Sequence, residues 1–334
     1  MYAGADIIET TLLEDYPDAF VQLLLDRTTR ENIFWATRDY EQLGEGYKYH
    51  NYIMPERITG DYGCVIMPRV KKDELLQQSR IREKAEVFTP SWVCNAQNNL
   101  IDDAWFGRSQ VFNREVQHPD GSRGWEVNPE PVSFPEGKSW QQYIREPRLE
   151  IACGEAPYVT SRYDTVTGAF IPIEQRIGFL DRKLRVADEN TEHSGTWLKA
   201  AQAAYMSSYA YEWQGDNLLL AREAMLATFI ENYEMKFGRK PLKRSIDYIA
   251  YIISWNVWQM DGMKGVVPDS CTSRVKKVTD LFNKIKTQTL PCEGCQNQDI
   301  HKHNGTYCII KDWKKRNLKT RRKGRPLKFI DLIK

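Results

Sequence analysis

Segments typical of strands and of helices alternate along the middle of the chain, and this alternation limits the possible folds more than any other feature. Residues 148–152 ("RLEIA") and 209–213 ("YAYEW") have the composition of short strands. Residues 195–209 and 217–237 have helical patterns, and the aromatic-rich residues 246–261 lead into or form a further strand. Alternating strands and helices favour an α/β domain with a parallel sheet, and we expect a doubly wound, Rossmann-like sheet.

The sequence divides into four segments around this alternation. We expect residues 1–84 to form a mostly helical N-terminal cap, because residues 18–35 have a helical pattern. Residues 85–285 would be the main domain, with Thr89 as a helix N-cap and with an irregular connection over 113–147. Two small segments follow, a cysteine-rich appendage at 286–310 and a basic tail with a terminal strand at 311–334.

Composition indicates the cellular setting. The 334 residues are 41% hydrophobic and 28% charged, as in globular proteins, and no apolar run reaches the ~18–20 residues that span a bilayer. The first twenty residues are acidic, unlike a secretory signal. The seven cysteines are an odd number, which argues against a disulfide framework. We therefore expect a cytoplasmic protein without a membrane partner.

Residues 291–308 ("PCEGCQNQDIHKHNGTYC") hold three of the seven cysteines and two of the five histidines. Cys292 and Cys295 have the Cys-x-x-Cys spacing of zinc sites, and Cys308 could be a third ligand. Either His301 or His303 would complete four nitrogen and sulfur ligands. We expect a structural zinc ion here; the alternative is free surface cysteines beside exposed histidines.

The last 24 residues are strongly basic. Residues 311–334 carry eleven Lys or Arg and two acidic residues, so their charge is +9 while the rest of the chain sums to −7. Such a segment can bind the phosphates of double-stranded DNA, although it can also be a solvated tail. The run Arg-Lys-Gly-Arg-Pro at 322–326 resembles segments that lay arginine in a narrow minor groove. The candidate DNA-binding residues are Arg321, Arg322, Lys323 and Arg325.

The loop after the first predicted strand, residues 149–158 ("LEIACGEAPY"), is a candidate ligand-binding loop. Open α/β sheets bind ligands at the carboxyl ends of their strands, where small residues let a ligand approach the backbone. An acidic residue at the end of the second strand suits ribose hydroxyls, and Glu212 fits this position better than the alternative, Asp181. Asp261 follows the third strand and could accept an adenine amino group, or it could open a turn.

The order of "VFTP", "EIACGEAPY", "YEWQGDNLLLARE" and "NVWQMDG" resembles the cofactor-binding half of DNA adenine-N6 methyltransferases, especially the modification subunits of restriction–modification systems. The resemblance covers residues 85–265 and implies that S-adenosylmethionine is the cofactor. The chain departs from the family loop at Ile151, in place of proline, and at Ala156, in place of the second glycine. The cofactor-binding residues that the resemblance implies are Phe88, Thr89, Pro90, Glu150, Ala152, Cys153, Gly154, Tyr158, Glu212 and Asp261.

One element of this family is absent from the sequence. Methylation of an adenine amino group needs a flipped base held by an Asn/Asp-Pro-Pro-aromatic loop, and no such motif occurs here. We therefore expect the chain alone to be inactive and a second polypeptide to supply the catalytic loop, with a restriction subunit as a further candidate partner. The alternatives are a non-enzymatic scaffold derived from a methyltransferase, and a methyltransferase acting on RNA or small molecules.

Overall fold

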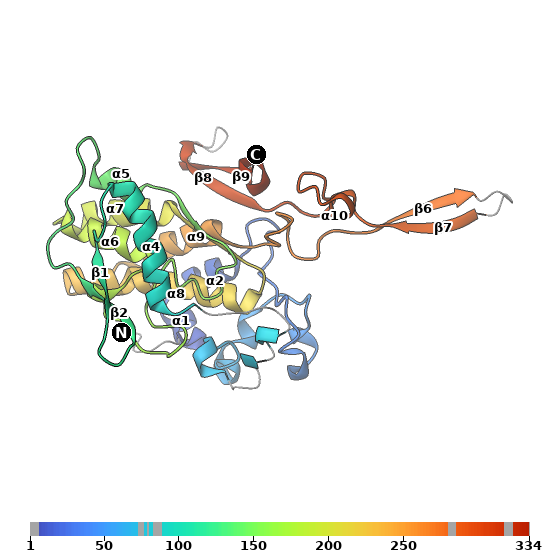
Figure 1. The fold of residues 1–334 in the computed structure, drawn as a ribbon. Coiled ribbons are helices and arrows are strands. Elements are labelled where there is room, and N and C mark those ends of the chain that lie inside the picture. The colour runs from blue at the N-terminus through green and yellow to red at the C-terminus, as the bar shows by residue number, and fades with distance from the viewer. Residues whose placement is uncertain are drawn as a thin grey trace.

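The computed structural model describes residues 7–72, 77–78, 80–82, 89–279, 285–316 and 323–333, and its fold is mixed α/β (Figure 1). The α-helices are α1 (Glu9–Asp15), α2 (Pro17–Leu24), α4 (Ser91–Phe106), α5 (Trp140–Ile144), α6 (Phe179–Glu189), α7 (Ser194–Met206), α8 (Gly215–Phe237), α9 (Lys243–Asn256) and α10 (Glu293–Asn297). The strands are β1 (Asn113–Gln117), β2 (Arg123–Val127), β3 (Arg148–Glu150), β4 (Ser208–Glu212), β5 (Val257–Gln259), β6 (Arg274–Thr279), β7 (Ile285–Leu290), β8 (Ile309–Arg316) and β9 (Lys323–Lys328).

The central sheet has three parallel strands in the order β3-β4-β5. Helices α6 and α7 connect β3 to β4, and α8 and α9 connect β4 to β5. Crossovers between parallel strands are right-handed, and both crossovers here advance in the same direction across the sheet. The helices of the two crossovers therefore lie on the same face of the sheet. The prediction of an α/β fold with parallel strands in this region is therefore confirmed.

The described residues do not form a doubly wound sheet. That arrangement needs a strand on the outer edge of β3 and helices on the second face, and no described strand lies at that edge. The second face instead packs against the β8–β9 hairpin and the 3₁₀ turn Phe329–Leu332. The Phe329 ring lies 6.1 Å from the Tyr211 ring and 5.3 Å from the Trp258 ring, between centroids.

Helix α8 lies at the centre of the main core, with nearly every residue up to Tyr233 buried. The helix ends at Phe237, the last residue of the predicted helical pattern, and the left-handed conformation of Gly238 (φ 64°) terminates it. Arg222, fully buried in this helix, donates to the carbonyl of Val257 at 2.9 and 2.7 Å and so ties α8 to β5. Because α8 buries all its faces, it requires layers on every side.

The N-terminal residues supply one of these layers. Phe20 and Trp35 are fully buried in the same core as α8. The predicted helix over 18–35 ends at Leu24, because Asp26 accepts hydrogen bonds from the amides of Thr28 and Thr29 at 2.9 and 2.7 Å and forms a turn. The cap is thus α-helical at α1 and α2, continues through 3₁₀ turns, and is α-helical again at the described residues 77–78 and 80–82.

Two further local predictions are corrected. The connection 113–147 is not irregular throughout, since it contains the β1–β2 hairpin and α5, where Ser139 and Gln142 form a capping box. Helix α4 begins at Ser91 with Pro90 as its N-cap, one residue later than predicted. The Ser91 amide donates to Asp164 at 2.8 Å, so a residue from another loop replaces the expected Thr89 cap.

The C-terminal residues form two antiparallel hairpins, β6–β7 and β8–β9. The β6–β7 ribbon projects away from the rest of the molecule, as Figure 1 shows on the right. The terminal strand predicted within residues 311–334 is present as β8 and β9, and after Lys328 the chain turns into 3₁₀ geometry. No helix within the described ranges is both long and apolar enough to cross a membrane.

Candidate functional site

The carboxyl end of the central sheet gathers acidic side chains. Glu150 is the last residue of β3, Glu212 is the last residue of β4, and Asp261 follows β5 by two residues. The strands are parallel and adjacent, so these three residues lie along one edge of the sheet. The predicted loop after β3 lies at the same edge.

Three residues of this loop have left-handed backbone conformations: Ala152 (φ 47°), Gly154 (φ 54°) and Ala156 (φ 60°). Alanine in this region is strained by about 1–2 kcal/mol relative to the right-handed conformation. Ala156 is fully buried. The loop therefore has a glycine-type backbone conformation at a buried position that is occupied by alanine.

Glu212 holds the loop against the end of β4. Its carboxylate accepts hydrogen bonds from the amides of Gly154 (2.7 Å), Trp213 (2.9 Å) and Gln214 (3.2 Å). A carboxylate has about four acceptor positions, and these three bonds occupy most of them. The residue is only 6% exposed, and any ligand hydroxyl would have to reach it beside the Gly154 amide.

Glu150 points into the loop that follows it. It accepts the amide of Val159 at 3.1 Å and, more weakly, that of Tyr158 at 3.4 Å. Burial raises the pKa of Glu150 well above its usual value, against the lowering effect of these two amides. Burial likewise raises the pKa of the Cys153 thiol, so Cys153 is a packed residue and not a thiolate nucleophile.

The predicted Phe-Thr-Pro segment lies against this loop where it is described. Phe88 lies outside the described residues, whereas the Thr89 carbonyl accepts a hydrogen bond from Thr165 at 3.0 Å. Burial raises the pKa of Tyr158 to about 12, and a hydrogen bond with the Thr89 side chain partly offsets this shift. The structure thus brings Thr89 and Tyr158 together from two distant parts of the sequence.

Two other predicted acids have local partners. The Asp261 carboxylate accepts a hydrogen bond from the Met263 amide at 3.0 Å and forms an ion pair with Lys264 at 2.9 Å. The backbone after Asp261 therefore forms the turn that was the alternative prediction for this residue. Asp181 lies in α6, where it accepts hydrogen bonds from the amides of Ser161 (2.8 Å) and Gly178 (3.0 Å). Between Glu212 and Asp181, only Glu212 is at the end of a strand.

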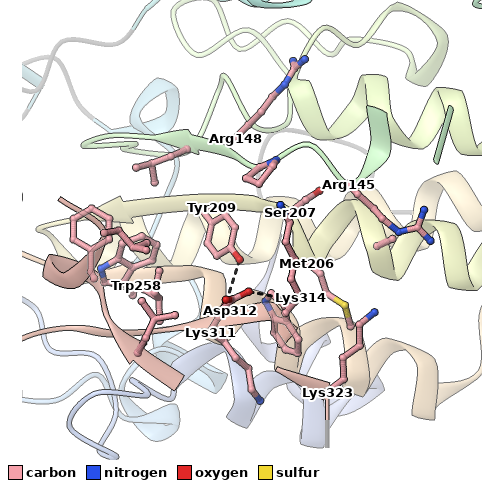
Figure 2. A pocket seen from close by; sticks show the side chains of 18 residues that line it. Arg145, Arg148, Met206, Ser207, Tyr209, Trp258, Lys311, Asp312, Lys314 and Lys323 are labelled. Atoms are coloured by element: carbon pink, nitrogen blue, oxygen red, sulfur yellow. Dashed lines mark hydrogen bonds between the residues drawn. The ribbon is translucent and has the colours of Figure 1, made fainter. Parts of the chain in front are cut away.

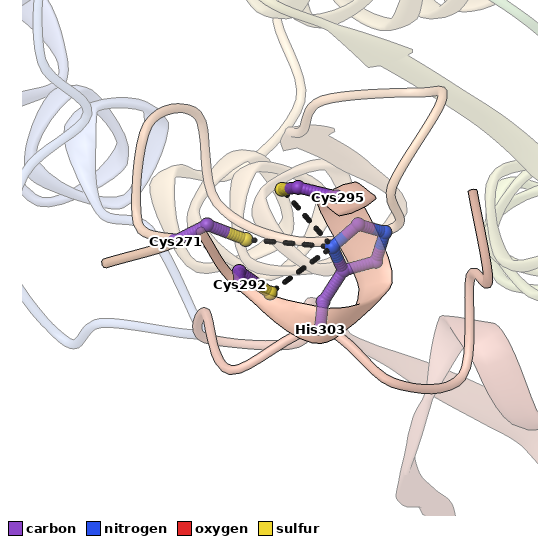
Figure 3. A group of neighbouring side chains, drawn as sticks. All are labelled: Cys271, Cys292, Cys295 and His303. Carbon is purple, nitrogen blue, oxygen red and sulfur yellow. Dashed lines mark hydrogen bonds between the residues drawn. The ribbon is translucent and has the colours of Figure 1, made fainter. Parts of the chain in front are cut away.

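A second site lies at the base of the β6–β7 hairpin. Cys271, Cys292, Cys295 and His303 place their ligand atoms within 4.8 Å of one another (Figure 3). The three sulfur atoms lie 3.5, 3.7 and 3.6 Å from His303 Nδ1, in the order of the chain. Three cysteines and one histidine form a closed four-ligand set, so the cluster can hold a metal ion such as zinc.

The surroundings of the cluster favour a thiolate at Cys292 but not at Cys271. Burial opposes ionisation of Cys292, but donation from the amides of Asn304 and Cys295 and from His303 lowers the pKa of this thiol to about 6. The Asn304 amide lies 3.1 Å from the Cys292 sulfur. Burial and the neighbouring Cys295 raise the pKa of Cys271 to about 12 in the absence of metal. A bound cation would replace these thiol protons.

The structure corrects two of the predicted ligands. Cys308 is buried in the smaller apolar cluster, where its sulfur lies 3.4 Å from the carbonyl oxygen of Gln259 on β5. His301 is exposed and lies outside the four-residue cluster. The fourth member of the cluster is Cys271, which the spacing within residues 291–308 could not predict because Cys271 lies outside that segment. Only the pairing of β6 with β7 brings Cys271 back to Cys292.

A cavity of about 530 Å³ lies between the outer edge of β3 and the β8–β9 hairpin (Figure 2). Its apolar lining includes Met206, Trp258 and Phe329. Basic side chains also line it, at Arg145, Lys314 and Lys323. The Tyr209 hydroxyl crosses the space and donates to the Lys311 carbonyl at 3.0 Å, joining the sheet to β8.

The predicted DNA-binding residues are only partly described. Arg321 and Arg322 lie outside the described residues, while Lys323 and Arg325 lie in β9, where Arg325 is exposed and pairs with Asp312 in the strand register. Burial and the nearby Arg145 lower the pKa of Lys323. This part of the tail is therefore a strand, and its role in DNA binding stays a prediction.

Searches of protein-family models, of curated proteins and of solved structures give no significant match to this chain.

Proposed function

We propose that this protein is a DNA-directed, S-adenosylmethionine-binding modification subunit of a restriction–modification adenine methyltransferase. The observation that carries the proposal is the 2.7 Å hydrogen bond between the Gly154 amide and Glu212. It joins the small-residue loop of the first parallel strand to the acid of the second strand, the two parts that hold a nucleoside cofactor in open α/β sheets. Zinc is the ion proposed for the Cys₃His cluster.

The loop residues fit such a cofactor in part. Gly154 and Ala156 have the backbone conformations that a glycine-rich loop uses to approach a ligand. Glu212 would have to exchange one of its present hydrogen bonds for a ribose hydroxyl, and Asp261 would have to release Lys264 to accept an adenine amino group. When bound, the cofactor would supply an activated methyl group; the protein residues would orient it and exclude water.

The partner that supplies the catalytic loop has a fitting surface at the edge of β3. The Arg148 amide donates a hydrogen bond to the carbonyl of Ser207, next to β4. The backbone amide and carbonyl of the following residue, Leu149, therefore point away from β4, and no backbone hydrogen bond from another described residue reaches them. Leu149 and Ile151 are 42% and 65% exposed there. A strand of the partner could pair with the outer edge of β3, where a doubly wound sheet has its next strand. The apolar side chains of that added strand would enter the cavity between β3 and the β8–β9 hairpin.

The experiment combines binding and catalysis in the purified chain, without a histidine tag. Calorimetry should show binding of S-adenosylmethionine or its demethylated product, and a methyl-transfer assay on duplex DNA should show no activity. Without a loop to orient the amino nitrogen, several kcal/mol of positioning advantage are lost. Absence of binding at millimolar ligand would overturn the cofactor proposal; activity of the single chain would overturn the partner proposal.

One observation favours a second candidate, a non-enzymatic scaffold. The carboxylates of Glu212 and Asp261 are already engaged by backbone amides and by Lys264. A scaffold would bind DNA with the same affinity in the presence and absence of the cofactor, and would support no methylation with any partner chain.

A further inference from the structure

The β6–β7 hairpin is a two-stranded ribbon that stands away from the body of the molecule (Figure 1). Six residue pairs hold the two strands together, from Arg274 opposite Leu290 to Thr279 opposite Ile285. At ~3.4 Å per residue, six paired residues extend about 20 Å. Neither strand belongs to the central sheet, and a two-stranded ribbon alone is at best marginally stable in water.

The metal-ligand cluster ties the two legs of this ribbon at its base. Cys271 precedes β6 by three residues, and Cys292 follows β7 by two residues. Cys295 and His303 complete the set from α10 and the loop beyond it (Figure 3). One ion would therefore fix the spacing of both legs and the direction in which the ribbon leaves the body.

The composition of the ribbon is basic and polar. The strands "RVKKVT" and "IKTQTL" contain four basic residues and no acidic residue. Among the residues whose side chains are described, Arg274, Thr287 and Thr289 are exposed, and Val275 is 65% exposed. The basic composition of the two strands suits a polyanion.

We propose that the β6–β7 ribbon is a metal-anchored arm that enters the major groove of duplex DNA. The major groove is about 12 Å wide and admits a two-stranded β-ribbon, while Lys and Arg on the strands can bind the flanking phosphates. This inference rests on the proposal that the protein is directed to DNA. It assigns a contact that is separate from the basic tail.

The test compares two charge variants of the full, metal-loaded chain. The arm variant combines Arg274→Gln, Lys276→Gln, Lys277→Gln and Lys286→Gln. The control variant makes the same charge change at exposed residues of the α8–α9 connection and of the first turn of α9, with Arg239→Gln, Lys240→Gln, Lys243→Gln and Arg244→Gln. Fluorescence anisotropy with a mixed-sequence 30-base-pair duplex gives the affinity of each at several salt concentrations.

The arm variant should flatten the slope of log affinity against log salt by about three units, because up to four phosphate contacts are lost. The control variant should change the slope by less than about one unit. Wild-type binding with equal slopes for both variants would overturn the arm inference and leave the DNA-directed function standing. No wild-type binding at low salt would overturn both.

Two further measurements test the groove and the metal. Dimethyl sulfate, which methylates guanine N7 in the major groove, should show protection by the wild type and not by the arm variant. Cys271→Ser should flatten the salt slope as much as the arm variant does, and combining the two should add nothing further. Major-groove protection that survives in the arm variant, or a Cys271→Ser slope equal to the wild-type slope, would contradict the anchored arm.

Discussion

Glu212 accepts the amide hydrogen of Gly154 at 2.7 Å, and this bond fixes the loop of β3 to the end of β4. The same carboxylate accepts hydrogen bonds from the amides of the next two residues, Trp213 and Gln214. Glu212 therefore orders this end of the sheet without a ligand. In the proposed function the same carboxylate would also bind the ribose of the cofactor, so Glu212 would have a structural role and a binding role. Its substitutions should separate the two roles.

Glu212→Gln keeps the shape of the side chain but turns one acceptor into an NH₂ donor that faces a backbone amide. We expect the free energy of unfolding to fall by about 1–3 kcal/mol, the cost of an unsatisfied buried polar group. Affinity for S-adenosylmethionine should fall by roughly ten-fold or more, an effect of the same origin. Urea denaturation and calorimetry measure the two effects. Glu136→Gln, at an exposed position, is the control and should change neither.

Asp216 in the first turn of α8 is the anion of a buried cluster. It accepts hydrogen bonds from Tyr40 (2.8 Å), Lys72 (3.2 Å) and Arg80 (2.8 Å). Burial opposes ionisation, but Arg80 and Lys72 outweigh it and hold the pKa of Asp216 well below its usual value. Asp216→Asn removes the carboxylate that pairs with Lys72 and one of the two carboxylates that pair with Arg80, and it should cost about 3–5 kcal/mol.

The pH dependence of this variant follows from the sign of the shift. Because the pKa of Asp216 is lower in the folded state, its contribution is present above the unfolded pKa of about 4 and is lost as pH falls below it. The difference in unfolding free energy between wild type and Asp216→Asn should therefore shrink between about pH 4 and pH 2. Asp15→Asn, in an exposed pair with Lys240 at 3.8 Å, should differ from wild type by less than about 1 kcal/mol. A constant difference for Asp216→Asn would contradict the assignment.

Asp188 shows the opposite shift. Burial raises its pKa to about 6, although donation from the Trp197 indole and the charge of Lys236 act against this. The folded state binds the proton more tightly than the unfolded state, so stability is lost as pH rises from about 4 to about 6. Asp188→Asn keeps an acceptor for Trp197 and should raise the free energy of unfolding at pH 7.5 by up to about 2 kcal/mol. At pH 4 the variant and wild type should melt together, as thermal denaturation at both pH values can check.

The sequence predicts the parts of the fold that are determined locally. The strand at 148–152 and the helix at 217–237 are close to β3 and α8, because their composition, periodicity and the terminating Gly238 agree with one another. The residues before Asp261 are ambiguous, since isoleucine and aromatic residues suit a strand and a buried helix alike. Burial of Ile246, Ile249 and Ile253 along one face makes most of that segment the helix α9.

Features that depend on distant partners could not be predicted in the same way. Ser91 is capped by Asp164, and Cys271 reaches Cys292 only when the β6–β7 hairpin has formed. Cys-x-x-Cys spacing predicts the half of the metal site contained in one short segment, whereas a ligand beyond a hairpin leaves no local spacing to recognise. The outer edge of β3 is a similar case, because a sequence cannot tell whether a sheet continues on another chain.

The metal centre allows a test that distinguishes the structural ligand set from the set expected from spacing. Cys271→Ser removes a thiolate from the four-ligand cluster, whereas Cys308→Ser changes a buried sulfur outside it. We expect wild type and Cys308→Ser to copurify with about one zinc per chain, measured by mass spectrometry of the metal, and Cys271→Ser to carry much less. Chelation should lower the melting temperature of wild type and of Cys308→Ser but leave that of Cys271→Ser unchanged, because the Cys271→Ser variant has no bound ion to lose.

The two histidines give the matching comparison. His303→Ala should behave as Cys271→Ser does, and His301→Ala as wild type. Zinc retained by Cys271→Ser and lost by Cys308→Ser would restore the ligands expected from the sequence and would leave the β6–β7 ribbon without its anchor.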